Sequence, residues 1–235
     1  MQVTFDHSAH EAANIITFYF KPERPFDYTA GQFIQLSLPH AEADERGQKH
    51  WFTLSSSPTD EFLTITTKFP LEGPTSTFKQ TLRGLKSGTP VDMSDPMGDF
   101  VLPKMTQTPL VFVAGGIGIT PFHSILSWLA STRETRPIKL LYAVHSEDEI
   151  IFQDTFANAG VHATIVVQDP TESWGGERGH ISAEMILGLE KPTEDTLVYV
   201  SGPEPMVEQI HADLKKAGLR PSQLVGDFFP NYKDY

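Results

Sequence analysis

The sequence predicts two folded units in tandem: an antiparallel β-barrel over residues 1–103 and a Rossmann-like α/β unit with a parallel sheet over residues 104–235. Three observations favour this fold class. Short segments rich in Phe, Thr, Ile and Val, separated by Pro-, Gly- and Asp-rich turns, fill the first part of the chain. The pattern then changes to alternating apolar strands and amphipathic helices. An apolar run that ends in a glycine turn, residues 111–121, opens this second pattern.

Composition limits the classes of protein and partner. The 235 residues are 39% hydrophobic and 11% aromatic, which is enough for two units with proper cores. The absence of cysteine excludes disulfides, zinc–thiolate sites and cysteine-ligated iron–sulfur clusters, and the nine histidines show no ligand spacing, so we expect no metal site. No apolar run is long enough to span a bilayer, and we expect a cytoplasmic protein. The net charge of −12 argues against nucleic acid as a partner.

The first unit has five segments of strand character, several of which alternate apolar and polar residues with a period of two. One helix is expected over residues 75–86, opened by Thr75 and Ser76 and closed near Gly84. The expected strands are residues 13–20, 32–38, 51–55, 62–69 and 89–93.

The second unit alternates strands and helices, as βαβ folds do. Its boundary with the first is expected near residues 102–108, where Pro103 and Pro109 bracket a polar stretch. The expected strands are residues 110–114, 139–144, 163–168, 196–201 and 223–228, and the expected helices are residues 120–131, 148–158, 182–189 and 205–217.

The glycine turn after the first of these strands predicts a phosphate site. Gly115, Gly116 and Gly118 let the backbone turn sharply and let an anion approach the exposed N–H groups. Thr120 is expected to cap the following helix, with Pro121 in its first turn. The run differs from the G-x-G-x-x-G fingerprint because proline stands in place of the third glycine. A tight connection without a ligand is the alternative interpretation.

Further motifs occur in a fixed order along the chain: AGQF at 30–33, HWFTLSSSP at 50–58, DPMGDF at 95–100, GGIGITP at 115–121, VSGPEPM at 200–206 and DFF at 227–229. In this order they resemble the ferredoxin–NADP reductase superfamily. The resemblance covers nearly the whole chain. It implies an FAD-binding barrel, an NAD(P)-binding α/β domain, and an enzyme that passes hydride from a nicotinamide cofactor to FAD and then electrons to an acceptor.

The resemblance places the flavin against the first unit. Phe52 would pack on the flavin ring, and the Thr53 hydroxyl would lie near the ring nitrogen that accepts hydride. His50 replaces the arginine that clamps flavin phosphate in this superfamily, and a neutral imidazole is a poorer clamp than a bidentate guanidinium. Lys49 beside it is a possible substitute. The cofactor contacts expected here are His50, Trp51, Phe52, Thr53, Leu54, Ser55, Thr66, Lys68, Thr75, Ser76 and Thr77.

The resemblance also places the nicotinamide nucleotide and three residues that tune the chemistry. Thr53, Ser201 and Asp227 are the expected catalytic residues; Ser201 stands where the superfamily usually has cysteine. Phe229 is expected to cover the flavin ring, a role for which Tyr232 and Tyr235 are alternatives. The expected nucleotide contacts are Gly115, Gly116, Gly118, Thr120, Pro121, Gly202, Pro203 and Met206.

Charge favours NADH over NADPH. Glu147, Asp148 and Glu149 follow the second parallel strand, where they would repel a 2′-phosphate by about 1 kcal/mol each if close. Arg178 is the residue that would offset this repulsion. NADPH therefore stays an alternative.

The electron acceptor is open at this stage. Lys79, Arg83 and Lys86 recur at helical spacing and would share one face, on which an acidic electron carrier could dock; a solvated face is the alternative. A membrane-bound redox partner is a further possibility. Two other functions remain: an NAD(P)H flavin reductase with loosely bound flavin, and a non-catalytic flavin- or nucleotide-sensing module.

Overall fold

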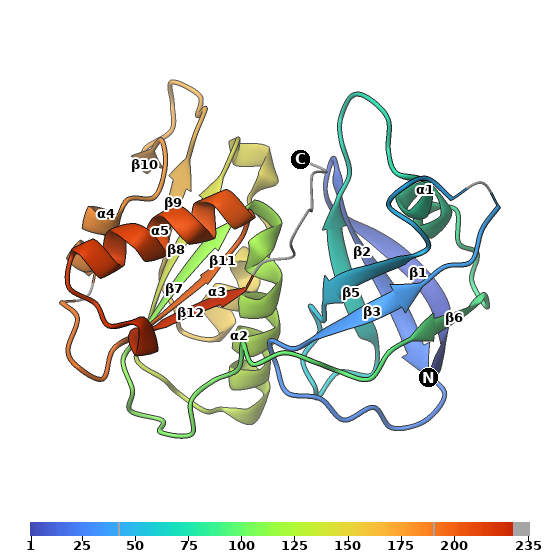
Figure 1. Ribbon diagram of the computed structural model, residues 1–235, viewed down its shortest axis with the longest axis horizontal. Coiled ribbons are helices and arrows are strands. Elements are labelled where there is room, and N and C mark those ends of the chain that lie inside the picture. The colour runs from blue at the N-terminus through green and yellow to red at the C-terminus, as the bar shows by residue number, and fades with distance from the viewer. Residues whose placement is uncertain (42, 190, 228–235) are drawn as a thin grey trace.

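The computed structural model describes residues 1–41, 43–189 and 191–227. Two six-stranded sheets lie side by side, each accompanied by its own helices (Figure 1). The first is antiparallel and barrel-like, and the second is parallel with helices on its faces. The predicted fold class, a β-barrel followed by a Rossmann-like α/β unit, is confirmed.

The first sheet has the strand order β4-β3-β6-β1-β2-β5. Its inward-facing aromatic and aliphatic side chains form one core, to which helix α1 contributes Phe78 and Leu82. The elements are β1 (Gln2–Ala12), β2 (Ile15–Pro22), β3 (Phe33–Ser37), β4 (Lys49–Thr53), β5 (Leu63–Lys68), α1 (Thr77–Arg83) and β6 (Pro90–Met93).

In the first sheet, strand β1 is the element that the sequence pattern did not predict. Only Val3 and Phe5 of its residues are buried, and its second half is polar. It is held by main-chain pairing with β2 and β6 rather than by an apolar face of its own. Side-chain periodicity therefore carries little signal for this strand.

Helix α1 is shorter than predicted. The Ser76 hydroxyl accepts a hydrogen bond from the Lys79 backbone N–H, so Ser76 is the N-cap, and the helix ends at Gly84. The predicted start at Thr75 and end at residue 86 are both wrong, since the chain beyond Gly84 turns back toward β6.

The second sheet has the order β10-β9-β8-β7-β11-β12, with parallel neighbours throughout. The central strand β7 is buried at every position, as expected for a strand covered on both faces. The elements are β7 (Leu110–Gly115), α2 (Thr120–Thr132), β8 (Ile138–Val144), α3 (Gln153–Asn158), β9 (Ala163–Val167), β10 (Glu177–Arg178), α4 (Ala183–Leu189), β11 (Leu197–Ser201), α5 (Glu204–Lys216) and β12 (Leu224–Asp227).

Two details of the helices differ from expectation. Thr120 is not the N-cap of α2, because a 3-10 turn at Gly116–Ile119 precedes the helix and Ile119 takes that position. The Thr120 hydroxyl instead donates to the Ile117 carbonyl. The predicted helix 148–158 is broken: Phe152 has a φ of +63°, and only Gln153–Asn158 forms α3.

The two sheets share an apolar contact. Ile15 and Phe100 of the first unit belong to the same cluster as Phe122 and Tyr199 of the second, and the Phe100 and Tyr199 ring centroids lie 5.1 Å apart. The Tyr199 hydroxyl donates to the Val101 carbonyl at 2.7 Å. The division at residues 103/104 stays a prediction. In residues 1–41, 43–189 and 191–227, none of the helices combines the length and apolar character needed to cross a membrane.

Candidate functional site

A cavity of 580 Å³ lies between the two sheets. It is bounded on one side by β4 and β5 and on the other by the carboxyl ends of the parallel strands β7, β8 and β11, where α/β sheets bind ligands. Among the predicted site residues, those that line it are Trp51, Phe52, Thr53, Thr66, Lys68, Gly115, Gly116, Gly118, Thr120, Ser201, Gly202, Pro203, Met206 and Asp227.

The remaining predicted residues lie elsewhere. Leu54 and Ser55 are buried next to β4, Pro121 is buried in the first turn of α2, and His50 packs in the barrel. Thr75, Ser76 and Thr77 surround the start of α1. Their cofactor contacts stay predictions. The prediction for Phe229 falls outside the described residues.

The glycine turns of the second unit interlock. A Cβ at Gly118 would lie 2.3 Å from the Ser201 carbonyl oxygen, and one at Gly115 would lie 2.3 Å from the Met206 sulfur. The turn after β7 therefore needs glycine at position 118 to pack against the backbone of the turn after β11. Gly116 has a φ of +53° and open space around its Cα, so a ligand can approach this backbone closely.

Ser201, which is buried, and Asp227, which is half-buried, form a pair on adjacent strands. They are register partners at the carboxyl ends of β11 and β12. Burial raises the pKa of Asp227 from 3.8 to about 6, and a hydrogen bond from Ser201 opposes part of that shift. This carboxyl consequently titrates close to neutral pH inside the cavity, where it can hold or release a proton.

The two neighbouring aromatic residues of β4 have different environments. Phe52 is 5% exposed and packs on Phe78 in the barrel core, with centroids 5.9 Å apart. Trp51 is 38% exposed and meets Phe33 edge to face. Of the two rings, Trp51 thus offers the larger accessible face to a planar ligand, whereas the role predicted for Phe52 stays a prediction.

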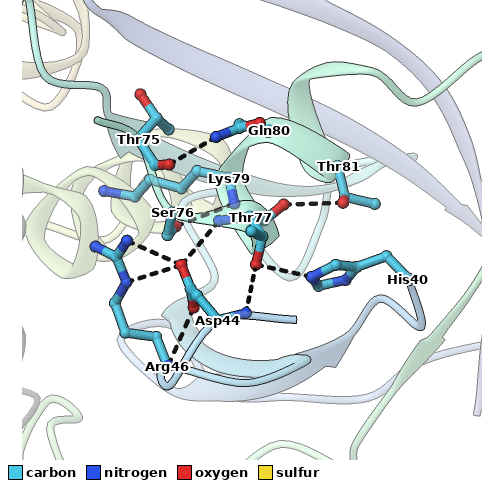
Figure 2. Close-up of polar contacts among 9 residues, drawn as sticks. All are labelled: His40, Asp44, Arg46, Thr75, Ser76, Thr77, Lys79, Gln80 and Thr81. Atoms are coloured by element: carbon cyan, nitrogen blue, oxygen red, sulfur yellow. Dashed lines mark hydrogen bonds and ion pairs between the residues drawn. The ribbon is translucent and has the colours of Figure 1, made fainter. Parts of the chain in front are cut away.

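The start of α1 already holds an anion from this chain (Figure 2). The Thr77 N–H and the Arg46 guanidinium both donate to the same carboxylate oxygen of Asp44, at 3.0 and 2.9 Å. The hydrogen bonds from Arg46 and Thr77 hold the pKa of Asp44 at about 2. The Thr77 hydroxyl accepts from the Asp44 N–H and lies 2.9 Å from the His40 ring.

This arrangement is consistent with anion binding at the position where the sequence predicted it. The anion bound there is the carboxylate of Asp44, beside a guanidinium that was not predicted as a site residue. The signal for Arg46 is weak in the sequence, since an Asp-x-Arg turn is common on surfaces.

An ion pair joins the two units at the cavity. The Lys68 ammonium on β5 contacts the carboxylate of Glu149, which is 6% exposed, and the Lys79 ammonium donates to the Lys68 carbonyl at 2.9 Å. Lys79 is itself 1% exposed, so the predicted basic face shared with Arg83 and Lys86 is wrong. Lys79 belongs to the cavity wall because the helix turns its side chain under β5.

The acids expected to discriminate against NADPH have separate partners. Glu147 accepts hydrogen bonds from Thr171, whose N–H lies 2.9 Å away and whose hydroxyl lies 2.6 Å away. These bonds hold its pKa below the usual range. Asp148 accepts from Ser146. Arg178 donates to main-chain carbonyls of the 171–174 segment, among them Trp174 at 2.8 Å, and so does not extend toward the cavity.

Comparisons with known proteins agree with this geometry. Residues 112–212 match the model of the oxidoreductase NAD-binding domain. The chain is 25% identical to a flavohemoprotein of Oceanobacillus iheyensis, covering 93% of this chain and 56% of that one. It is 26% identical to the NADH oxidoreductase HCR of Escherichia coli, covering 91% of this chain and 63% of that one. The chain therefore spans little more than half the length of these curated relatives.

A solved structure shows the same fold. The flavohem-like FAD/NAD-binding domain of nitric oxide dioxygenase from Vibrio cholerae superposes with a TM-score of 0.83 at 22% identity, covering 97% of this chain and 98% of that one. At this identity the likeness concerns the fold.

Proposed function

Given that the chain has the two-domain fold of the ferredoxin–NADP reductase superfamily and carries an oxidoreductase NAD-binding domain, we propose that it is a flavin-dependent NAD(P)H oxidoreductase. It would pass hydride from a nicotinamide cofactor to FAD and then electrons to a protein or small-molecule acceptor. One observation carries the proposal. A single cavity brings the hydroxyl-bearing strands of the barrel together with the two glycine turns at the carboxyl ends of β7 and β11.

The residues around the cavity fit these two cofactors. Trp51, Thr53 and Thr66 offer a planar ring and hydroxyls on the barrel side, suited to a flavin ring. Gly116, with open space at its Cα, and Gly202 offer main-chain N–H groups on the other side, suited to a pyrophosphate. FAD, rather than FMN, follows from the superfamily.

The chain's own contribution to the chemistry is positioning and proton control. Bound flavin supplies a hydride acceptor that can release electrons singly, which a nicotinamide cannot do. The two walls of the cavity would hold the two cofactors in reacting contact, and such positioning contributes several kcal/mol to catalysis, on the order of magnitude known for oriented reactants. Thr53 would orient one ring by its hydroxyl. Ser201 holds the Asp227 carboxyl in place, and Asp227 holds a proton at its carboxyl oxygen below a pH of about 6.

NADH is the nucleotide we favour. The Arg178 guanidinium is committed to main-chain carbonyls, which leaves it poorly placed to bind a 2′-phosphate. The physiological electron acceptor is a redox protein or a small molecule. A redox protein in this role could be an acidic carrier or a membrane-bound partner.

A second function, flavin reductase with flavin as a passing substrate, is favoured by the carboxylate of Asp44 at the start of α1. A flavin phosphate would have to displace this carboxylate from Thr77 and Arg46, which weakens flavin retention.

Steady-state oxidation of NADH with an artificial electron acceptor separates the candidates. A reductase with resident FAD turns over without added flavin. A flavin reductase requires added FAD or FMN and saturates with it. Absence of turnover under both conditions contradicts the proposed function and leaves a binding module.

A further inference from the structure

A row of hydroxyl groups crosses the barrel sheet from the surface to the cavity. The Thr17 hydroxyl donates to the Glu11 carboxylate at 2.7 Å and lies 2.8 Å from the Thr66 hydroxyl. Thr66 lies 2.9 Å from the Ser55 hydroxyl, which lies 2.9 Å from that of Thr64. Of these residues, only Thr66 lines the cavity.

Strand pairing places the row. Thr17 of β2 and Thr66 of β5 are register partners, so their side chains stand on the same face of the sheet. Glu11 falls in an irregularity of the β1–β2 ladder, between the pairs formed by His10 and Ala12. Such a bulge redirects a side chain, and here it brings the carboxylate over the neighbouring strand.

The middle of the row is shielded from water, and its end is not. Thr17, Thr66 and Ser55 are 3%, 5% and 0% exposed. Glu11 is partly exposed at the edge of the unit. The phenol of Tyr19 on β2 is near it, since burial and then the charges of Glu11 and Asp60 raise the pKa of that phenol.

Each hydroxyl has one proton, which fixes the direction of the bonds. Thr17 donates to Glu11, so it accepts from Thr66. The proton of Thr66 is thereby used, so Thr66 accepts from Ser55, and by the same reasoning Ser55 accepts from Thr64. All four bonds point toward the carboxylate, and Thr66 keeps a lone pair for a group in the cavity.

We propose that Glu11, Thr17 and Thr66 form a proton relay between solvent and the cavity. A group in the cavity gives a proton to the Thr66 oxygen, Thr66 gives its own proton to the Thr17 oxygen, and Thr17 gives its own to the Glu11 carboxylate, which releases it to solvent. Each hydroxyl oxygen loses one O–H bond and gains another, and Glu11 returns to the carboxylate form. This transfer leaves the hydroxyls pointing toward the cavity, so the reverse sequence can then carry a proton inward from Glu11.

The relay rests on the proposed function, which requires such a proton. Full reduction of a flavin by NAD(P)H takes two electrons and two hydrogen nuclei, one as hydride from the nucleotide and one as a proton from solvent. When the electrons leave again to a one-electron acceptor, protons must return to solvent. With the cavity filled by two stacked rings, a hydroxyl row through its wall provides a route that open water no longer does.

Thr17→Val tests the relay, because valine keeps the shape of the side chain and removes the middle hydroxyl. Thr64→Val is the matched control: it removes a hydroxyl from the same row, outside the path between Glu11 and the cavity. Thr17→Ser should restore the path. Thermal unfolding and FAD affinity, measured on every variant, report folding and flavin binding separately.

The readout is the pH-jump relaxation of bound oxidised FAD, followed by the absorption change when its ring N–H ionises in alkali, without nucleotide or acceptor. We expect relaxation about a hundredfold slower in Thr17→Val, the lower range for positioned proton transfer, and unchanged in Thr64→Val and Thr17→Ser. Equal rates in Thr17→Val and wild type, with FAD bound, overturn the relay alone. Failure of the wild type to bind FAD or FMN overturns the proposed function and the relay with it.

Discussion

The two units line their shared cavity with different kinds of groups. The barrel presents side chains: the ring of Trp51, the hydroxyls of Thr53 and Thr66, and the ammonium of Lys68. The α/β unit presents two glycine turns, after β7 and β11, together with the side chains of Glu149 and Asp227. Side-chain groups depend on how the barrel packs, whereas main-chain groups depend on whether the turns can close. We therefore expect substitutions in the barrel to change flavin affinity and stability, and substitutions at the turns to change nucleotide affinity.

Adjacent aromatic residues of β4 should give the largest contrast within the barrel. Phe52→Ala removes a ring that is buried on Phe78 and should lower the free energy of unfolding by about 4 kcal/mol. Trp51→Ala removes a ring with 38% exposure and should change stability far less while weakening flavin binding. Chemical denaturation and FAD titration measure both quantities. Equal losses of stability in the two variants would contradict the assignment of Phe52 to the barrel core and of Trp51 to flavin binding.

Asp227 should make the stability of the α/β unit depend on pH. Its pKa in the folded protein is about 6, above the ordinary aspartate pKa of 3.8 that we expect in the unfolded chain. Between these two pH values the folded state therefore binds more protons than the unfolded state. Stability therefore falls as pH rises through this window and stays low above it. Asp227→Asn should remove this dependence and be more stable at pH 7.5, by at most about 3 kcal/mol. Urea unfolding at pH 5 and 7.5 tests the sign; a wild type that gains stability over that interval relative to the variant contradicts it.

Gly118→Ala should disturb the interlocked turns. The added Cβ would lie 2.3 Å from the Ser201 carbonyl oxygen, a backbone atom with little freedom to move. We expect a loss of about 2 kcal/mol of stability and weaker NADH binding. Gly188→Ala, in α4 with no atom within 4 Å, is the control and should be neutral or slightly stabilising. Denaturation curves and NADH titration distinguish them, and identical behaviour would argue against close packing of the turns.

Asp44→Asn should have the smallest of these effects, on flavin affinity. Removal of the carboxylate charge leaves Arg46 and the Thr77 N–H more available to a phosphate. Affinity for FAD should rise by about tenfold, the scale of one charge-assisted hydrogen bond, whereas affinity for riboflavin, which has no phosphate, should not change. Fluorescence quenching measures both. Weaker FAD binding would mean that Asp44 supports the site instead of competing for it.

The sequence predicted the α/β unit better than the barrel, for physical reasons. A buried parallel strand, a glycine turn and a helix follow one another locally, so β7, the turn and α2 could be located from adjacent residues. Strand β1 has no such local signal, because its pairing partners hold it. Thr120 was wrongly predicted as the N-cap, because a 3-10 turn precedes α2 and such turns are frequent at helix N-termini.

The candidate site shows the same limit. Most of the residues predicted from motifs line the cavity, and their roles stay predictions. Contacts between distant segments were not predicted: the Lys68–Glu149 ion pair, the burial of Lys79, and the Asp44 carboxylate at α1. Each of these features depends on contacts between segments that are far apart in the sequence. The periodicity of apolar residues within one segment carries no information about such contacts.

We propose that the cavity brings a flavin and a nicotinamide nucleotide into reacting contact. The most direct test is the visible absorption spectrum of the protein with FAD bound, recorded anaerobically before and after addition of NADH and then, on a fresh sample, NADPH. We predict that the flavin band is bleached by NADH at a lower concentration than by NADPH. A flavin band that neither nucleotide changes would contradict the claim.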